Sequence, residues 1–571
     1  MIQPKRWQIA PILTPQANES LLKFPTILRQ VLFNRGYATD TKARAFLKAE
    51  TDFDTDPFQM TGMEMAAARI QYAIEQKEPI AIYGDYDVDG VSATVLLVQA
   101  IEALGGNARP YIPNRMDEGY GLNPKALNRL KSDGVNLVIT VDSGIRSPAE
   151  ASYAQAIGLD LIISDHHQPA EGELPYALAV INPKQAGDRY PEKDLAGVGV
   201  AYKIAQALFS RKEISGLVFQ LEDLLDLVAL GTVADLVPLV GENRVLVRKG
   251  LQKIRETKRQ GLFSLAAVSD LPLTRTTAIS IGFILGPRLN AAGRMESARA
   301  AYDLLSTTDV KQAGELAQQL NIQNRQRQEL TRKIQDEAEA MVQADDPGAS
   351  LLFAVSPDFN SGVVGLAAAR LAETYYRPAV VGQIIEGEGV VRCSCRSIPE
   401  FQITQALDQC KDLLIRYGGH AAAAGFTVSK ENLEPIKKRL KSIADLQLGS
   451  KDLRQTLISD AEVPLSDLNS ELLKYLDHLQ PTGYGNPEAV FVTRNVRVMH
   501  SRIVGAEGKH LKLSVTDGHV TFDAIGFRLG HLQSKLPLNV DLIYTFESNE
   551  YNGRTTLQLN LKDVKAPGAL E

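Results

Sequence analysis

Acidic residues and histidines stand directly after several apolar runs in this 571-residue chain. The clusters lie in residues 82–90, 141–144, 164–167 and 232–238. Carboxylates that share a cleft repel one another unless a positive charge lies between them. A pair of divalent metal ions would supply that charge, and two such ions can activate water and stabilise the oxygens of a phosphate ester under attack. The pattern therefore predicts a phosphate-cleaving enzyme.

Five side chains form the candidate metal-ligand set: Asp87, Asp89, Asp142, His166 and Asp235. Asp87 and Asp89 are two residues apart after an expected strand, so both can face one point, and Asp142 is placed to bridge two ions. Oxygen ligands with few nitrogens suit Mn²⁺ or Mg²⁺ better than zinc. We expect two ions in the site, about 3.5–4 Å apart.

Each of these residues alone also has a structural explanation. An isolated pair of acids is more often a helix cap or a surface turn, and a single histidine is more often packed than bound to metal. Residues 85–90 also resemble the start of a calcium-binding EF-hand loop, but the glutamate that closes such a loop is absent. Only the four clusters together favour the metal site.

The segments around the clusters indicate how they are positioned. Residues 80–83, 136–141 and 159–164 are short apolar runs, and residues 91–104 form an expected helix ended by two glycines. Apolar strands that alternate with helices are typical of an α/β fold with a doubly wound parallel sheet. Ligands bind beyond the carboxyl ends of such strands, so we expect the clusters to converge there.

The remaining composition predicts several further parts. Residues 310–346 contain a long polar helix that ends at a Pro-Gly breaker, a second α/β pattern follows, and short alternating strands typical of a β-barrel end the chain. We expect an N-terminal helical extension over residues 1–54, a catalytic domain over 55–309, a connector helix over 310–346, a second α/β domain over 347–447 and a β-barrel over 455–566.

Bulk composition excludes several classes of protein. The chain is 44% hydrophobic with a net charge of −6, which argues against a surface coated in positive charge for duplex DNA. No apolar run is long enough to cross a membrane and the start lacks a secretory signal, so we expect a cytoplasmic protein. Its three cysteines, Cys393, Cys395 and Cys410, fit reduced structural thiols.

Several motifs carry a resemblance to a known family. Residues 165–167 match the Asp-His-His motif of the DHH phosphoesterase superfamily, and residues 83–90 match its first motif, although many members carry His where Tyr83 stands. Residues 286–294 add a further match, and the resemblance extends across residues 55–565. Within the superfamily, the chain is similar to the RecJ family of 5′→3′ exonucleases specific for single-stranded DNA.

The resemblance implies roles for individual residues. The five candidate ligands would hold the metals, His167 would contact the scissile phosphate or act as an acid, Asp165 would orient the histidines, and Asp85 would assist beside the ligands. Ser394 and Arg396 would bind the 5′ phosphate, although the family usually has small residues where Cys393 and Cys395 stand. The implied substrate-binding set is Arg115, Arg288, Asn290, Arg294, Ser394, Arg396, Gly418, Gly419 and His420.

Two of these groups rest on further matched segments. Residues 286–294 are expected to form an apolar, Gly-rich loop whose two arginines bind phosphate oxygens, and Arg115 belongs to a matched segment at 113–122. The C-terminal barrel resembles an OB fold, in which basic side chains would follow the phosphates while Tyr484 and Phe491 stack on bases. A basic cluster at 244–259 either lines the path of the strand or is an ordinary helix surface.

The resemblance implies release of 5′-mononucleotides from single-stranded DNA, in DNA repair and recombination, with a helicase and a single-strand-binding protein as possible partners. Two alternatives stay open. One is a DHH phosphodiesterase of short oligonucleotides or cyclic dinucleotides, whose members are usually shorter and lack the barrel. The other is a non-catalytic replication-assembly subunit, whose members typically lose the metal ligands.

Overall fold

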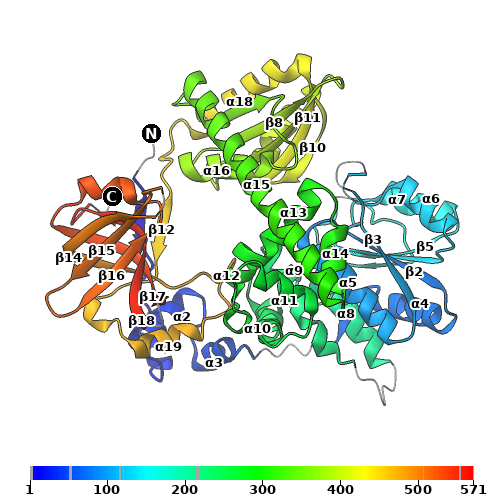
Figure 1. Ribbon diagram of the computed structural model, residues 1–571, viewed down its shortest axis with the longest axis horizontal. Helices are drawn as coiled ribbons and strands as arrows, with labels where there is room; N and C mark the ends of the chain where they lie inside the picture. The colour runs from blue at the N-terminus through cyan, green and yellow to red at the C-terminus, as the bar shows by residue number, and fades with distance from the viewer. Residues whose placement is uncertain are drawn as a thin grey trace. The chain divides into compact units, whose positions relative to one another are not determined.

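The computed structural model describes residues 4–50, 55–114, 118–119, 121–170, 172–211, 219–505, 507–551 and 554–569. The chain divides into two compact units (Figure 1). The larger unit holds residues 10–324 and 460–567, and the smaller unit holds residues 1–9, 325–459 and 568–571. Within the described residues, no helix combines the length and the apolar character that a membrane span needs.

A five-stranded sheet lies at the centre of the first part of the larger unit, in the order β3-β2-β4-β5-β6, with parallel pairings throughout. Its strands are β2 (Pro79–Gly84), β3 (Asn107–Tyr111), β4 (Leu137–Val141), β5 (Asp160–Ser164) and β6 (Ala179–Ile181). Alternate residues of a strand face opposite sides of a sheet, and both sides are covered here. One face packs on α4 (Met63–Glu75), α5 (Val88–Ala103) and α8 (Gly197–Ser210), and the other on α6 (Pro124–Ser132) and α7 (Pro148–Ala156). The predicted doubly wound parallel sheet is confirmed.

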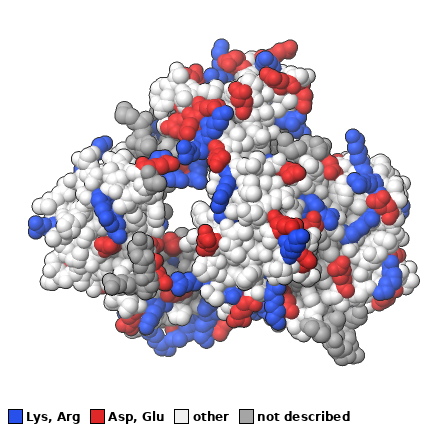
Figure 2. Space-filling view, in the orientation of Figure 1, with Lys and Arg blue, Asp and Glu red and all other residues white. Residues whose placement is uncertain are grey.

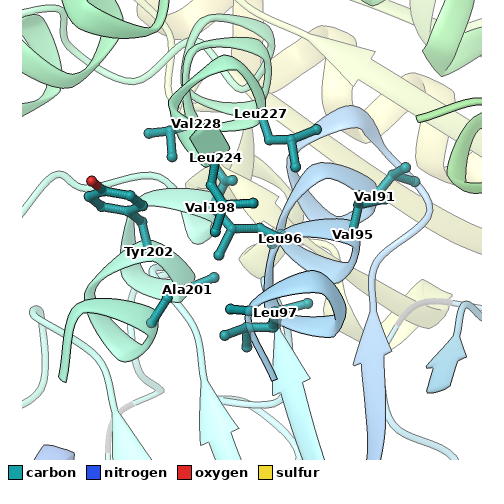
Figure 3. Close-up of a cluster of buried hydrophobic side chains, with 14 of the residues drawn as sticks. Val91, Val95, Leu96, Leu97, Val198, Ala201, Tyr202, Leu224, Leu227 and Val228 are labelled. Carbon is teal, nitrogen blue, oxygen red and sulfur yellow. The ribbon is translucent and has the colours of Figure 1, made fainter. Parts of the chain in front are cut away.

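Helix α9 (Leu225–Ala234) is apolar on all sides because it is surrounded by other helices. It packs against α5, α8 and α10 (Gly241–Arg255). Figure 3 shows Leu96 of α5, Val198 of α8 and Leu227 of α9 in one cluster of buried side chains. This packing holds the end of α9, and with it Asp235, in a defined place.

Residues 286–294 form a helix, so the expectation of a loop was wrong. The segment lies in α13 (Gly286–Met295), which directly follows a π-helix, η4 (Ile281–Leu285). Its glycines disfavour a helix by propensity, but they allow close packing: a Cβ on Gly293 would lie 2.6 Å from the Tyr86 carbonyl oxygen. Tertiary contact therefore decides the conformation.

The other helices of this region are α11 (Gln260–Ala267), α12 (Ala278–Ser280) and α14 (Arg299–Ser306). Helix α15 (Val310–Asp345) follows them as one continuous helix of 36 residues, close to the predicted connector.

The smaller unit contains a five-stranded sheet in the order β10-β11-β9-β8-β7, in which only β7 and β8 are parallel. Its strands are β7 (Leu352–Ser356), β8 (Ala379–Ile385), β9 (Val390–Arg396), β10 (Leu414–His420) and β11 (Ala423–Ser429). Its helices are α16 (Val364–Tyr375), α17 (Ile403–Asp408) and α18 (Leu433–Leu448). A short pair, β1 (Arg6–Ile9) with β12 (Thr456–Ser459), joins the start of the chain to this unit.

The last part of the chain is a closed barrel in the larger unit. Its five strands are ordered β14-β15-β16-β18-β17, and β17 pairs back with β14. The strands are β14 (Val490–Val504), β15 (His510–Thr516), β16 (Thr521–Gly526), β17 (Asn539–Tyr551) and β18 (Arg554–Lys565), with β13 (Ala461–Glu462) beside β14. The predicted OB-type barrel is confirmed.

Helices from the start of the chain complete the barrel's core. The barrel shares one apolar cluster with side chains of α2, α3 and α19. The helices are α1 (Pro15–Ser20), α2 (Thr26–Asn34), α3 (Asp40–Lys48) and α19 (Ser470–Asp477). On the face shown in Figure 2, basic and acidic side chains are interspersed.

Candidate metal centre and phosphate pocket

Four proposed ligands from separate segments converge at the carboxyl edge of the parallel sheet. The Nε2 atom of His166 lies 3.1 Å from Oδ1 of Asp142, 3.5 Å from Oδ2 of Asp235 and 3.9 Å from Oδ2 of Asp89. His166 is only 4% exposed, and Asp89 is fully buried. A group of two buried acids and one partly buried acid around one imidazole is suited to a cation.

Asp89 and Asp142 are held by the start of α8. The backbone N–H groups of Gly197 and Val198 donate to the two oxygens of Asp89, at 2.6 and 2.9 Å. A Cβ on Gly197 would lie 2.6 Å from Cβ of Asp142, and a Cβ on Gly231 would lie 2.6 Å from Oδ1 of Asp89. Glycine is therefore required at both positions to make room for the carboxylates.

The backbone at Asp87 and Asp142 is also specialised. Asp87 caps the N-terminus of α5, where its side chain accepts from the N–H groups of Asp89 and Gly90. Asp142 directly follows β4 and has a φ of 60°, in the left-handed region that non-glycine residues rarely adopt. Strained backbone of this kind concentrates at functional sites.

Asp165 points inward and organises the two histidines. Its Oδ1 accepts from the backbone N–H groups of His166 and His167, at 2.7 and 3.0 Å, and lies 2.8 Å from Nδ1 of His167. Its other oxygen accepts from the N–H of Ile145. With Nδ1 of His167 directed at this carboxylate, Nε2 is the ring nitrogen that can exchange a proton elsewhere.

Charge repulsion in the cluster is large. Burial, followed by the charges of neighbouring carboxylates, raises the pKa of Asp89 to about 7 and that of Asp235 to about 9, and raises the pKa of Asp142 well above its ordinary value. Burial and the charge of His167 lower the pKa of His166 to about 3, so its imidazole is neutral. A neutral imidazole among acids that resist ionisation is the donor set that a divalent cation would stabilise.

Two metal positions fit these residues. Three groups bring their ligand atoms within 4.8 Å of one another: Asp89, His166 and Asp235; Asp85, Asp87 and Asp142; and Asp142, His166 and His167. The first two groups provide mainly carboxylate oxygens with a single imidazole, which are ligands of Mn²⁺ and Mg²⁺. The third group links the other two, because it shares His166 with the first and Asp142 with the second. Asp85, for which a helper role was expected, lies with the ligands.

Helix α13 lies against the loop that carries Asp87. The Oδ1 atom of Asn290 accepts from the N–H of Val88 at 3.1 Å. Arg288, two residues earlier on the helix, donates to Asn321 and to the Ile284 carbonyl. Arg294 is on the same helix. The structure thus brings Asn290 to the metal loop.

In the smaller unit, Ser394 and Arg396 lie together beside the start of α16. Both are on one face of β9, because they are two residues apart in a strand. A Cβ on Gly365, at the start of α16, would lie 3.2 Å from Nη2 of Arg396 and 3.4 Å from Oγ of Ser394. A helix N-terminus beside a guanidinium and a hydroxyl is suited to a phosphate.

The register places three further predicted residues in the same sheet. Across the sheet from β9 to β11 and then to the edge strand β10, Ser394 is followed by Gly425 and Gly418. Along the same path, Arg396 is followed by Ala423 and His420. Gly419 has a φ of 141°, and a Cβ there would collide with the Ala423 carbonyl.

The departures from the family pattern have structural explanations. Tyr83 is buried, donates its hydroxyl to the Gly121 carbonyl at 2.9 Å and stacks on Tyr111, on the sheet face opposite α5. Cys393 and Cys395 lie on the buried face of β9, and burial raises the pKa of both thiols.

The predicted residue Arg115 lies outside the described residues.

The structure also bears on two expectations for the nucleic-acid surface: base stacking by aromatic residues of the barrel, which was wrong for Phe491, and the role of the basic cluster at 244–259. Phe491 is buried in the barrel core, where it cannot stack on a base, whereas Tyr484 is exposed. Within the basic cluster, Arg244, Arg255 and Arg259 donate to carbonyl or carboxylate oxygens of the protein. These arginines hold the fold together.

Sequence reasoning missed Gly197 and Gly231, which accommodate the carboxylates, and the N–H groups at the start of α8. The segment Gly197-Val198-Gly199 was a usable signal, since paired glycines at a helix start allow close approach to a ligand or side chain.

Comparison with known families matches three segments of the chain. Residues 79–232 match the DHH family, N-terminal domain; residues 348–445 match the DHHA1 domain; and residues 459–563 match the RecJ OB domain.

Individual relatives cover nearly the whole chain. It is 38% identical over 545 residues to the single-stranded-DNA-specific exonuclease RecJ of Bacillus subtilis, covering 95% of this chain and 68% of that protein. The Salmonella typhimurium RecJ is 34% identical over 567 residues, covering 95% and 96%. The crystal structure of Thermus thermophilus RecJ in complex with Mn²⁺ superposes with a TM-score of 0.85 at 28% identity, covering 99% and 80%. The same protein in complex with Mg²⁺ gives a TM-score of 0.79.

Proposed function

The chain belongs to the RecJ family of single-stranded-DNA-specific exonucleases, and we propose that it hydrolyses single-stranded DNA from the 5′ end and releases 5′-mononucleotides. The observation that carries this proposal is the convergence of Asp89, Asp142 and Asp235 on His166 in one largely buried cluster. A non-catalytic assembly subunit would have no reason to retain these acids, whose mutual repulsion destabilises the fold.

The proposed ligands are Asp87, Asp89, Asp142, His166 and Asp235, with Asp85 beside them. Mn²⁺ or Mg²⁺ ions bound there supply activation of water and compensation of charge on the phosphate. The protein's own contribution is position: the start of α8 fixes Asp89, and the strained backbone fixes Asp142.

His167 is the proposed residue for proton exchange with the substrate. Although burial opposes it, the hydrogen bond to Asp165 raises the pKa of His167, so the ring retains a proton more readily than an ordinary histidine. Asp165 stabilises that protonated ring and fixes its orientation. Such a pair can donate a proton to a leaving oxygen.

The direction of digestion is proposed to come from the phosphate pocket of the smaller unit. Ser394, Arg396 and the N-terminus of α16 would hold the terminal 5′ phosphate, with Gly418, Gly419 and His420 beside them on the sheet. Arg288, Asn290, Arg294 and Arg115 are proposed to contact the strand nearer to the metals. A guanidinium matches two phosphate oxygens at once, which suits it to this task.

The division into parts is also proposed: an N-terminal extension over residues 1–54, the catalytic domain over 55–309, the connector over 310–346, the substrate-binding domain over 347–447 and the OB domain over 455–566. The family matches at 79–232, 348–445 and 459–563 support these limits. We place the enzyme in cytoplasmic DNA repair and recombination, with a helicase and a single-strand-binding protein as proposed partners.

The test is digestion of a single-stranded oligonucleotide labelled in turn at each end, with Mn²⁺ and with a chelator. The proposal expects early release of a labelled mononucleotide from the 5′ end alone, and none with chelator. Cleavage of dinucleotides with intact long DNA would instead indicate a phosphodiesterase of short oligonucleotides. Absence of metal-dependent hydrolysis would indicate the assembly subunit.

A further inference from the structure

The side chain of Phe283 is 78% exposed, on the solvent side of its helix. It lies in the π-helix η4 between Ile281 and Leu285, whose side chains are fully inside the core. π-Helical turns occur frequently at functional sites. The ring contributes little to the core and is available to a ligand.

The turn that carries Phe283 packs on the last turn of α9, next to a proposed metal ligand. A Cβ on Gly282 would lie 4.0 Å from Cγ1 of Val233, and a Cβ on Gly286 would lie 3.6 Å from Cβ of Ala234. The next residue is Asp235. Phe283 is therefore anchored close to the metal centre.

The residue that follows the proposed metal ligand Asp235 also exposes an apolar side chain to solvent. Leu236, which follows Asp235, is 67% exposed and has a φ of 59°, a strained conformation for a leucine. Its side chain thus adds to the apolar surface beside Asp235.

A second exposed aromatic ring is held at the other end of the same segment. The N–H of Leu239 donates to the Tyr484 carbonyl at 2.7 Å, and a Cβ on Gly485 would lie 2.8 Å from Cβ of Pro238. The Tyr484 side chain itself is 64% exposed. Backbone contact therefore fixes its place beside residues 238–239, while the ring stays available.

The Tyr484 loop is rigid as well as close. The buried guanidinium of Arg244 donates to the carbonyls of His478, Leu479 and Pro481, and the Asn486 side chain donates to the carbonyls of Leu479 and Pro481. A ring on a rigid support loses little entropy when it binds a ligand.

The π-helical turn that carries Phe283 continues into α13, which carries the phosphate-binding candidates. Seven residues separate Phe283 from Asn290, which contacts the metal loop, so the two are about 10 Å apart along the helix. Arg288 and Arg294 are on the same helix. Aromatic surface next to guanidinium groups is the combination by which proteins bind single-stranded nucleic acid.

We propose that Phe283 and Tyr484 stack on bases of the substrate strand at opposite ends of the segment 233–239, with Leu236 between them, and that this stacking favours unpaired over paired DNA. The proposal rests on the exonuclease function proposed above. The faces of bases within a duplex are covered by neighbouring base pairs, whereas an unpaired strand can turn its bases onto protein rings.

The experiment compares Phe283→Ala and Tyr484→Ala with Phe283→Trp and Tyr484→Trp, which keep a stacking surface. Phe263→Ala is the matched control, because Phe263 is an equally large exposed ring on α11, which packs against α14. The alanine variants should raise KM for an unpaired oligonucleotide about tenfold each, mainly through lost stacking. The tryptophan variants and Phe263→Ala should stay near wild type.

Abasic substrates separate stacking from a structural role. A single abasic site is moved along the first several nucleotides of the oligonucleotide. At one position, the abasic site should raise the KM of wild type by the same factor by which Phe283→Ala raises KM on normal DNA. The abasic site at that position should not raise the KM of Phe283→Ala any further. Tyr484→Ala should behave in the same way at a different position.

Equal KM values for wild type and the alanine variants would overturn the stacking proposal while leaving the exonuclease function intact. Independent, multiplicative losses from the abasic site and the variant at every position would overturn it too. Failure of the wild-type enzyme to digest any DNA would overturn both proposals.

Discussion

A Cβ atom on Gly197 would lie 2.6 Å from the Cβ of Asp142, nearer than two carbon atoms can approach without displacement. The N–H of the same glycine donates to Asp89. One residue without a side chain therefore sets the spacing of two proposed ligands that are far apart in the sequence.

Replacing Gly197 with alanine should displace Asp142 or the start of α8. Because misplacement of a reacting group by about 1 Å can cost on the order of 100-fold in rate, we expect a loss of that size in kcat on single-stranded DNA. Gly199→Ala, on the same turn but with its nearest neighbours at 3.4 Å, is the control. Equal activity of the two variants would show that the Gly197 contact relaxes without consequence.

Asp142→Asn should abolish DNA cleavage and weaken the binding of Mn²⁺. Burial is the larger cause of the raised pKa of Asp89 and Asp235, and repulsion between the carboxylates is the second. Because a bound cation would relieve that repulsion, Mn²⁺ should stabilise the wild-type protein against heat. The measurement is the rise in Tm with Mn²⁺, which mass action converts into affinity. Asp142→Asn should show a clearly smaller rise; a full rise together with turnover would exclude Asp142 as a ligand.

Chelation should reverse that stabilisation. With metal removed by EDTA, wild type should lose all cleavage and unfold at a lower temperature, since the carboxylate cluster is then uncompensated. Restoring Mn²⁺ should recover both properties. Cleavage that persists after exhaustive dialysis against chelator would contradict the metal-centred site.

Arg396→Ala should reduce activity on 5′-phosphorylated strands by about tenfold or more, because hydrogen bonds between charged groups contribute about 1.5–3 kcal/mol. Strands with a 5′ hydroxyl should be affected much less. Arg392→Ala is the matched control: it lies on the same strand and faces the same side, but pairs with Glu388. The two substrates are compared by kcat/KM, and equal losses on both would contradict a role in binding the terminal phosphate.

Arg244→Met should destabilise the larger unit by about 3 kcal/mol, because several buried carbonyls lose their donor. The guanidinium carbon also lies 4.1 Å from the centre of the Phe46 ring. A methionine side chain has no charge and would replace this cation–π contact poorly. Urea unfolding measures the effect, with Lys249→Met, an exposed position on the same helix, as control. An unchanged midpoint would mean that the carbonyls find other donors.

Local sequence was sufficient to predict much of the site. Apolar strands followed by acids implied a parallel sheet, and the carboxyl ends of its strands share one edge, so Asp87, Asp142 and His166 had to lie near one another. Once β9 is known to be a strand, the spacing of Ser394 and Arg396 places both on one face and Cys393 and Cys395 on the other. Period and spacing act over a few residues, and the sequence displays them directly.

The limits of sequence appear where segments far apart in the chain meet. The glycine content of residues 286–294 suggested a loop, yet those glycines lie in a helix. Gly293 contacts the Tyr86 backbone and Gly286 contacts the Ala234 side chain. Phe491 looked available for bases because alternation along a strand does not say which face a closed barrel turns inward.

The sequence by itself determined the fold class, the family and the identity of the acids and histidines, since these follow from local patterns and motifs. Only the tertiary structure decided how the carboxylates are spaced by Gly197 and Gly231, and which aromatic rings are buried and which, like Phe283, stay exposed. The physical reason is that exclusion of one atom by another depends on three-dimensional contact, which no short segment encodes alone.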